Sequence, residues 1–94
     1  MIEIMTFRFA DEVDESAFRA VDERVQVQFS YQQPGFIRRT LGRRNDRWLV
    51  LTIWANVEAA DAARAAFDVS ALGAEFIGLI DRGSLTVERY EGVA

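Results

Sequence analysis

One eight-residue run, Trp48 to Ala55, limits the folds open to this chain more than any other feature. The run is unbroken and rich in β-branched and aromatic residues, which predicts a β-strand. Successive side chains point to opposite faces of a strand. One face holds Trp48, Val50, Thr52 and Trp54, and the other holds Leu49, Leu51, Ile53 and Ala55. A strand with one face in water alternates apolar and polar residues. This strand is apolar on both faces, so we expect both to be covered.

The segments around this run predict the order strand, helix, strand, strand, helix, strand. Asp14 is placed to cap the first helix, which is expected to run to about Gln33, where Pro34-Gly35 ends it and turns the chain. The expected strands are Ile2 to Phe9, Phe36 to Arg43, Arg47 to Ala55 and Leu85 to Tyr90, and the later helices are Val57 to Asp68 and a short Ser70 to Ile80. This is the split βαβ, ferredoxin-like order of the α+β class, with both main helices on one face of an antiparallel sheet.

The second sheet face leads to a prediction about assembly. The chain has 94 residues, which is one domain spanning residues 1–94, and no segment remains to cover the face opposite the helices. A bare apolar face is a site of association. Two-fold dimers are the commonest homo-oligomers. We therefore expect a homodimer that joins through its sheet faces.

Several kinds of chemistry are excluded by residues that the sequence lacks. There is no cysteine and no histidine, and all 11 basic residues are arginine. This rules out thiol nucleophiles, zinc-thiolate sites, histidine ligands to haem and lysine Schiff bases. Carboxylates, tyrosines, hydroxyls, amides, tryptophans and arginines remain. No metal and no cofactor is expected.

Charge and the first residues give expectations about location and partners. The start of the sequence lacks the basic segment and apolar core of a signal peptide, and no run reaches the ~18 apolar residues of a membrane span. We therefore expect a cytoplasmic protein without a membrane partner. The net charge of −4 disfavours nucleic acid, although arginines gather along the predicted hairpin. Those arginines are interpreted as partners of the acidic residues near Asp11 and Asp22.

Three segments resemble a known family over nearly the whole chain. They are Pro34-Gly35-Phe36, the run Trp48 to Asn56 before an alanine-rich helix, and Phe76 to Asp81 followed by Leu85 to Tyr90. They are similar to the dimeric α/β-barrel superfamily, in particular its antibiotic-biosynthesis-monooxygenase-like branch. The resemblance implies a dimer whose sheets close a barrel, and a pocket between sheet and helices in each subunit. Some relatives oxygenate polyphenols or quinols without metal or flavin, and others bind small effectors. The haem-degrading branch is disfavoured here because it uses a histidine.

The resemblance also implies candidate site residues. Trp54 matches a tryptophan on the third strand of the cofactor-free oxygenases, whereas their preceding asparagine is replaced by Val50 or Thr52. The indole N–H of Trp54 could stabilise a developing oxyanion, with Arg38 or Asn56 as a second polar group. The candidate substrate-binding residues are Thr52, Thr40, Val50, Phe76 and Phe29.

Each candidate has a structural alternative that the sequence leaves open. Trp54 would otherwise be a core or interface residue, Arg38 a rim residue paired with an acid, and Asn56 a helix cap. Trp48, nearer the hairpin, is expected at an interface or as surface cover. Two functions therefore remain: a cofactor-free monooxygenase acting on planar phenolic compounds, and a non-catalytic module that binds a small aromatic ligand or supports assembly.

Overall fold

The computed structural model describes residues 1–94 and confirms the α+β, ferredoxin-like order. In chain order the elements are β1 (Ile2–Phe7), α1 (Glu15–Arg24), the π-helical turn η1 (Val25–Phe29), the 3-10 turn η2 (Ser30–Gln32), β2 (Phe36–Arg44), β3 (Arg47–Trp54), α2 (Val57–Asp68), α3 (Ala71–Ile77), the 3-10 turn η3 (Arg82–Ser84) and β4 (Thr86–Tyr90). No helix is both long and apolar enough to cross a membrane.

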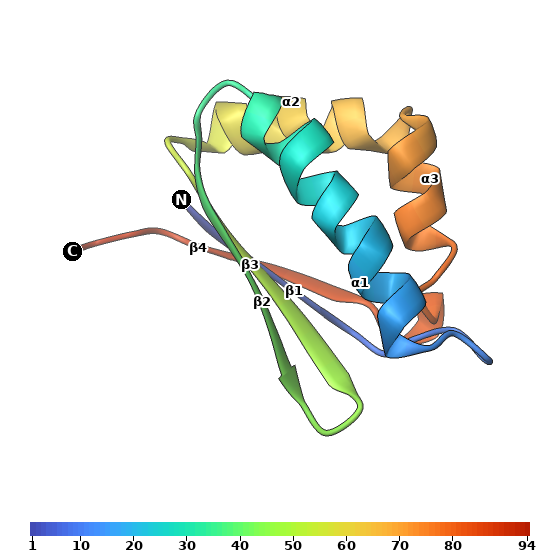
Figure 1. Cartoon of the computed structure of the whole chain (residues 1–94). Helices are drawn as coiled ribbons and strands as arrows, with labels where there is room; N and C mark the ends of the chain where they lie inside the picture. Colours follow the sequence, from blue (N-terminus) through green and yellow to red (C-terminus); the bar gives the residue numbers. More distant parts are fainter.

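The four strands form one antiparallel sheet in the order β2-β3-β1-β4. All three α-helices lie on the same face of this sheet, and nothing in the chain lies on the other (Figure 1). We call these the helix face and the open face. The β2–β3 hairpin extends beyond the helices (Figure 1).

The register of β3 assigns its side chains to these faces. Trp48, Val50, Thr52 and Trp54 lie on the helix face and are buried. The apolar members of the open face are only half-buried: Ile2, Ile4, Leu49, Leu51 and Ile53. The expected alternation of β3 is therefore confirmed, and the helices cover only the face that carries the tryptophans.

An aromatic cluster fills the core between the sheet and the helices. Phe7, Phe18 and Phe76 are fully buried at its centre, and the Phe7 and Phe18 rings lie 5.5 Å apart. Trp48 stacks on Phe9 with ring centroids 5.0 Å apart. The expectation that Trp48 is an interface or surface residue is wrong, because its strand position points it toward the helices.

The helix starts follow the sequence closely, and the end of the first helix does not. Asp14 Oδ1 accepts a hydrogen bond from the Ala17 N–H at 2.7 Å, which confirms Asp14 as the cap of α1. The prediction of a single helix that runs to Gln33 is wrong. Helix α1 ends at Arg24, and the chain continues in a helical path through the π-helical turn η1 and the 3-10 turn η2. Gly35, with φ of 80°, then turns the chain into β2.

Candidate functional site

A small space lies between the helix face of the sheet and the helices, and we call it the inner cavity. Its volume is about 70 Å³. It is lined by Glu3, Met5, Val25, Phe29, Ser30, Arg39, Val50, Thr52, Trp54, Ala60, Ala63, Arg64, Phe67 and Phe76. Most of these side chains are apolar, and the few polar ones sit at defined places in the wall, as in small-molecule sites.

Trp54 supplies the least satisfied polar group of this wall. Only 6% of the residue is exposed, and its ring packs edge-on against Phe36 at 5.8 Å. Its Nε1–H has no hydrogen-bond partner, and it is the one buried side-chain nitrogen or oxygen in the chain without one. Leaving such a donor unpaired costs roughly 1–3 kcal/mol. A ligand oxygen in the inner cavity would remove that cost.

A buried ion pair forms another part of the wall. Arg39 Nη1 and Nη2 donate to the two carboxylate oxygens of Asp22, at 3.1 and 2.6 Å. The side chains are 4% and 9% exposed. Arg39 lies on β2 directly opposite Thr52 of β3, and Asp22 descends from α1. The pair therefore joins the first helix to the edge strand.

Sequence reasoning expected the hairpin arginines to pair with the acidic residues near Asp22, and the structure confirms this for Arg39. It did not predict that this pair would be buried in the cavity wall. A signal was available, because Asp22 is four residues after Phe18 and three before Val25, which are both buried. Residues at these spacings share one helix face. An acidic residue on the buried face of a helix requires a buried cation as its partner, and Arg39 is that partner.

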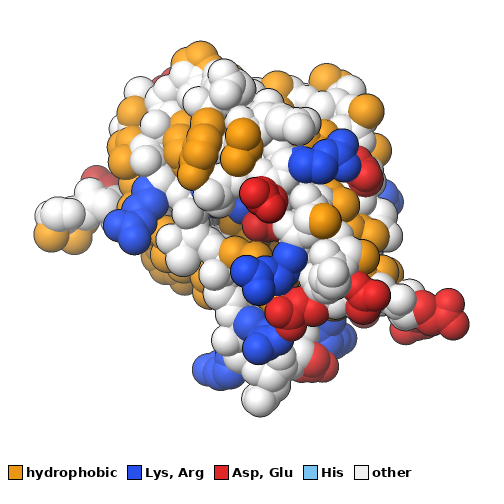
Figure 2. All heavy atoms as spheres, in the orientation of Figure 1, with side chains coloured by type: hydrophobic (Ala, Val, Ile, Leu, Met, Phe, Trp, Pro, Cys, Tyr) orange, Lys and Arg blue, Asp and Glu red, His pale blue; other side chains and the backbone are white.

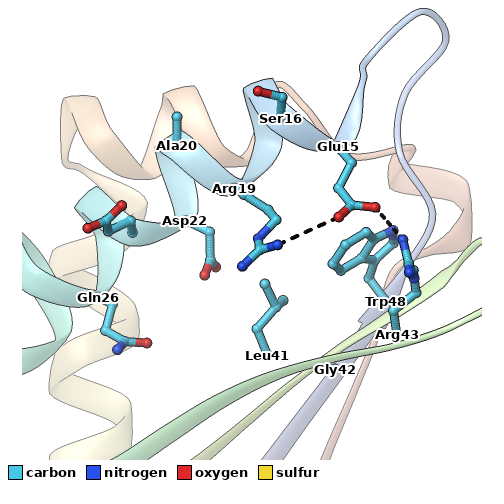
Figure 3. A pocket seen from close by; sticks show the side chains of 11 residues that line it. Glu15, Ser16, Arg19, Ala20, Asp22, Gln26, Leu41, Gly42, Arg43 and Trp48 are labelled. Atoms are coloured by element: carbon cyan, nitrogen blue, oxygen red, sulfur yellow. Dashed lines mark hydrogen bonds and ion pairs between the residues drawn. The ribbon is translucent and has the colours of Figure 1, made fainter.

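A larger, open depression lies between α1 and β2, and we call it the outer groove (Figure 3). Its volume is about 980 Å³. It is lined by Glu15, Ser16, Arg19, Ala20, Asp22, Glu23, Gln26, Leu41, Gly42, Arg43 and Trp48. Figure 2 shows that charged side chains of both signs gather at this end of the molecule.

Arg43 and Glu15 hold the hairpin end of the outer groove. The Arg43 guanidinium lies over the Trp48 ring, 5.4 Å from its centroid, and it also bonds to Glu15. Glu15 in turn lies 3.7 Å from Arg19, one turn along α1 (Figure 3). These side chains are half-exposed to exposed, so the pairs add little stability. They do frame an apolar floor made by Trp48 and Leu41.

The far side of the inner cavity is closed by a second ionic network. Glu3 accepts from Arg89 Nε at 2.9 Å and lies 3.6 Å from Arg64. Arg89 also donates to Asp61 at 2.6 Å. The hydrogen bond to Asp61, helped by Glu3, raises the pKa of Arg89 against the smaller opposing effect of burial. Arg89 therefore stays charged and ties β4 to α2 and β1.

The structure brings five of the eight expected site residues together. Trp54, Thr52, Val50, Phe76 and Phe29 all line the inner cavity. Three lie elsewhere. Arg38 and Thr40 pair with Ile53 and Leu51, so strand alternation places them on the open face, opposite Trp54. Asn56 is exposed, and its Oδ1 accepts from the Ala59 N–H at 2.8 Å as the cap of α2. No cluster of acidic side chains is placed to hold a metal ion.

Comparison with known proteins identifies the architecture. No protein-family model and no curated protein matches the sequence. Among solved structures, the chain is similar to SnoaB, a cofactor-independent oxygenase from Streptomyces nogalater, with a TM-score of 0.77, 19% identity and coverage of 98% of this chain and 93% of that one. It is also similar to a candidate antibiotic biosynthesis monooxygenase from Caulobacter crescentus, with a TM-score of 0.81, 18% identity and coverage of 99% and 89%.

A candidate antibiotic biosynthesis monooxygenase from Chloroflexus aurantiacus is similar with a TM-score of 0.67 and 17% identity, over 99% of this chain and 94% of that one. Identities this low establish architecture and not activity. The structural similarity nevertheless spans almost every residue of both proteins in each comparison, including the strand that carries Trp54 and the helices that cover it. This chain has the fold of the antibiotic biosynthesis monooxygenases.

Proposed function

We propose that this protein is a homodimeric, cofactor-independent monooxygenase that acts on a planar phenolic compound bound against Trp54. One observation carries the proposal: a buried indole N–H without a partner, in an apolar cavity, on this fold. The resemblance to SnoaB supports it, because that protein is a cofactor-independent oxygenase of the same fold. The residues of this chain then position the substrate and provide polar groups around it, and the substrate supplies the electrons.

The chemistry needs no redox group from the protein. A ring carbon of the substrate phenolate bonds to O₂ and gives a peroxide. Loss of water then breaks the O–O bond and leaves a ring carbonyl. One oxygen atom enters the product as the new carbonyl and the other leaves as water. The phenol is oxidised by four electrons to the quinone level and so supplies all the electrons that reduce O₂. Trp54 Nε1–H donates to the developing oxyanion, and the apolar lining keeps out bulk water.

The same proposal includes a dimer through the open face. That face carries Ile2, Ile4, Leu49, Leu51 and Ile53, which no element of the chain covers. Contiguous apolar surface of this kind marks an interaction site. A second copy brings an identical apolar face, so each face covers the other.

Two observations favour a second function, a binding module without turnover. The inner cavity holds about 70 Å³, roughly half of the ~150 Å³ that admits benzene in an engineered apolar cavity. Val50 and Thr52 also stand where the resemblance would place an asparagine. This alternative differs from the first in one measurable respect, which is oxygen consumption.

Oxygen uptake with a hydroxynaphthalene as the test phenol separates the two functions. We expect uptake by the wild-type protein, and a fall in kcat of about 10²–10³-fold in Trp54→Phe, as for loss of an oxyanion donor. Tyr31→Phe, which alters a half-exposed ring outside the inner cavity, should leave kcat unchanged. Saturable binding without uptake would support the module, and absence of both binding and uptake would reject both functions.

A further inference from the structure

We propose that the outer groove and the inner cavity are two halves of one binding site for an aromatic acid, and that the Asp22–Arg39 ion pair closes the passage between them. The acidic group of the ligand binds Arg39 in place of Asp22, while its planar body lies in the outer groove. An aromatic acid is thus the ligand class proposed for the site described above. It rests on the proposed function only for the location of that site.

The position of the ion pair is the first support. Asp22 lines the outer groove and Arg39 lines the inner cavity, and their hydrogen bonds of 2.6 and 3.1 Å join the two walls. The register of β2 and β3 shows the same boundary between the groove and the cavity. Leu41 of the groove lies opposite Val50 of the cavity, and two residues further Arg39 lies opposite Thr52.

Volume and shape are the second support. The inner cavity, at about 70 Å³, has room for the acidic or phenolic oxygens of a ligand, so the fused rings of such a ligand must lie in the outer groove. The outer groove, at about 980 Å³, has the room. Its floor is apolar, formed by Leu41 and Trp48, and Arg43 lies over the Trp48 ring (Figure 3). A flat aromatic body can lie along Leu41 and the small exposed part of Trp48, beside the Arg43 guanidinium.

The donors at the inner end select an anion. Two of the five N–H groups of the Arg39 guanidinium bond to Asp22, which leaves three. Trp54 Nε1–H is unpaired, and Thr52, which pairs with Arg39 in the register of β2 and β3, also lines the inner cavity. The fork of an arginine matches a carboxylate, so an incoming carboxylate can replace that of Asp22 with the same geometry. Glu3, the one acid of the inner lining, is already paired with Arg89 and Arg64.

The backbone next to Asp22 allows the exchange. Asp22 lies in the last turn of α1, and the π-helical turn η1 follows at once. Val25 and Phe29 of this turn line the inner cavity, and Gln26 lines the outer groove. Single π-helical turns that interrupt α-helices are frequent at functional sites. A small outward shift of this segment would carry the Asp22 carboxylate from Arg39 into the water of the groove.

Calorimetric titration with naphthoate and with neutral naphthamide tests the proposal. We expect naphthoate to bind the wild-type protein about tenfold more tightly or better, because its charge is paired with Arg39. Asp22→Asn removes the competing carboxylate and should tighten naphthoate binding while leaving naphthamide unchanged. Arg39→Gln should reduce the affinity for naphthoate to that for naphthamide. Arg24→Gln and Glu75→Gln alter a half-exposed pair in which Arg24 Nη1 donates to both Glu75 carboxylate oxygens, and they should change neither affinity.

The outcomes separate this proposal from the oxygenase. Equal affinity for the two ligands, or weaker naphthoate binding by folded Asp22→Asn, would overturn it. If Arg39→Gln fails to fold because Asp22 is left buried and unpaired, the double variant Asp22→Asn/Arg39→Gln replaces it, and a remaining preference for naphthoate would be decisive against Arg39. Charge-selective binding without oxygen uptake keeps this site and rejects the oxygenase. Uptake of oxygen with a neutral naphthol, without charge-selective binding, does the reverse.

Discussion

Asp22 and Arg39 carry full charges at positions that exclude almost all water. Burying each charge costs several kcal/mol, and their two hydrogen bonds return a similar amount, so the pair adds little net stability. Removing one partner is different, because it leaves an uncompensated buried charge and costs about 3–5 kcal/mol. The pair is thus better suited to holding α1 in register with β2, and to exchange with a ligand anion, than to stabilising the fold.

Gly35 is a residue at which a single methyl group should be damaging both to the backbone conformation and to packing. Its φ of +80° strains any L side chain, and an added Cβ would lie 2.6 Å from the Cβ of Ala59 on α2. Its carbonyl also accepts a hydrogen bond from the Ala55 N–H at 2.8 Å. We expect Gly35→Ala to lower the free energy of unfolding by about 1–3 kcal/mol, measured by urea denaturation.

A second glycine provides the control for this substitution. A Cβ on Gly83 would meet only Asp81 Oδ1, at an ordinary 3.5 Å. Gly83→Ala should therefore change the unfolding free energy by less than about 1 kcal/mol. Equal losses in the two variants would show that the turn at Pro34-Gly35 does not depend on its left-handed conformation.

Residue by residue, the sequence predicted the apolar half of the site better than the polar half. Trp54 could be found because the resemblance places a tryptophan on the third strand, and strand alternation then assigns Val50 and Thr52 to the same face. Arg39 could not be separated from Arg38, since choosing between them requires knowing which sheet face the helices cover. A pattern that is apolar on both faces of β3 gives no such information.

Asn56 connects β3 to α2, and its role belongs to the scale of the element. It accepts from the Ala59 N–H at 2.8 Å and thereby satisfies one of the free N–H groups at the start of the helix. We expect Asn56→Ala to lower the melting temperature, with a loss of about 1 kcal/mol in unfolding free energy. Differential scanning calorimetry measures the effect.

Replacement by aspartate distinguishes this cap from a catalytic role. Asn56→Asp keeps an oxygen that can accept from Ala59, and its charge is favourable at a helix N-terminus. Its stability and its oxygen uptake should equal those of the wild-type protein. Full stability with loss of uptake would instead return Asn56 to the list of catalytic candidates, although it lies outside the inner cavity.

Element boundaries could be predicted where a side chain sets them and not where packing sets them. Asp14 and Asn56 start α1 and α2 through their own oxygen atoms, which a sequence displays. The change from α1 to the π-helical turn after Arg24 has no such marker. It places Val25 and Phe29 against the sheet together, and only the tertiary contacts of those two side chains specify it.

At the scale of the whole molecule, three helices cover one sheet face and leave the other bare (Figure 1). The helix face encloses both the inner cavity and the ion pair that bounds it, whereas the open face holds no cavity residue of β3. The proposed ligand site and the proposed dimer contact therefore lie on opposite faces of the sheet. A substitution on the open face can change assembly without entering the site.

Leu51 gives the sharpest test of assembly, because it lies near the middle of the open face, opposite Ile4 of β1 and Thr40 of β2. A glutamate there would place like charges near the two-fold axis of the proposed dimer, at a cost far above that on a monomer surface. We expect the wild-type protein to have the mass of a dimer in multi-angle light scattering, and folded Leu51→Glu the mass of a monomer. Val69→Glu, at a position 87% exposed between α2 and α3, should remain dimeric.

A wild-type protein that is monomeric at micromolar concentration, or a Leu51→Glu variant that stays dimeric, would place the contact elsewhere. If ligand titrations give the same affinities in the monomeric variant, each subunit contains a complete site on its helix face.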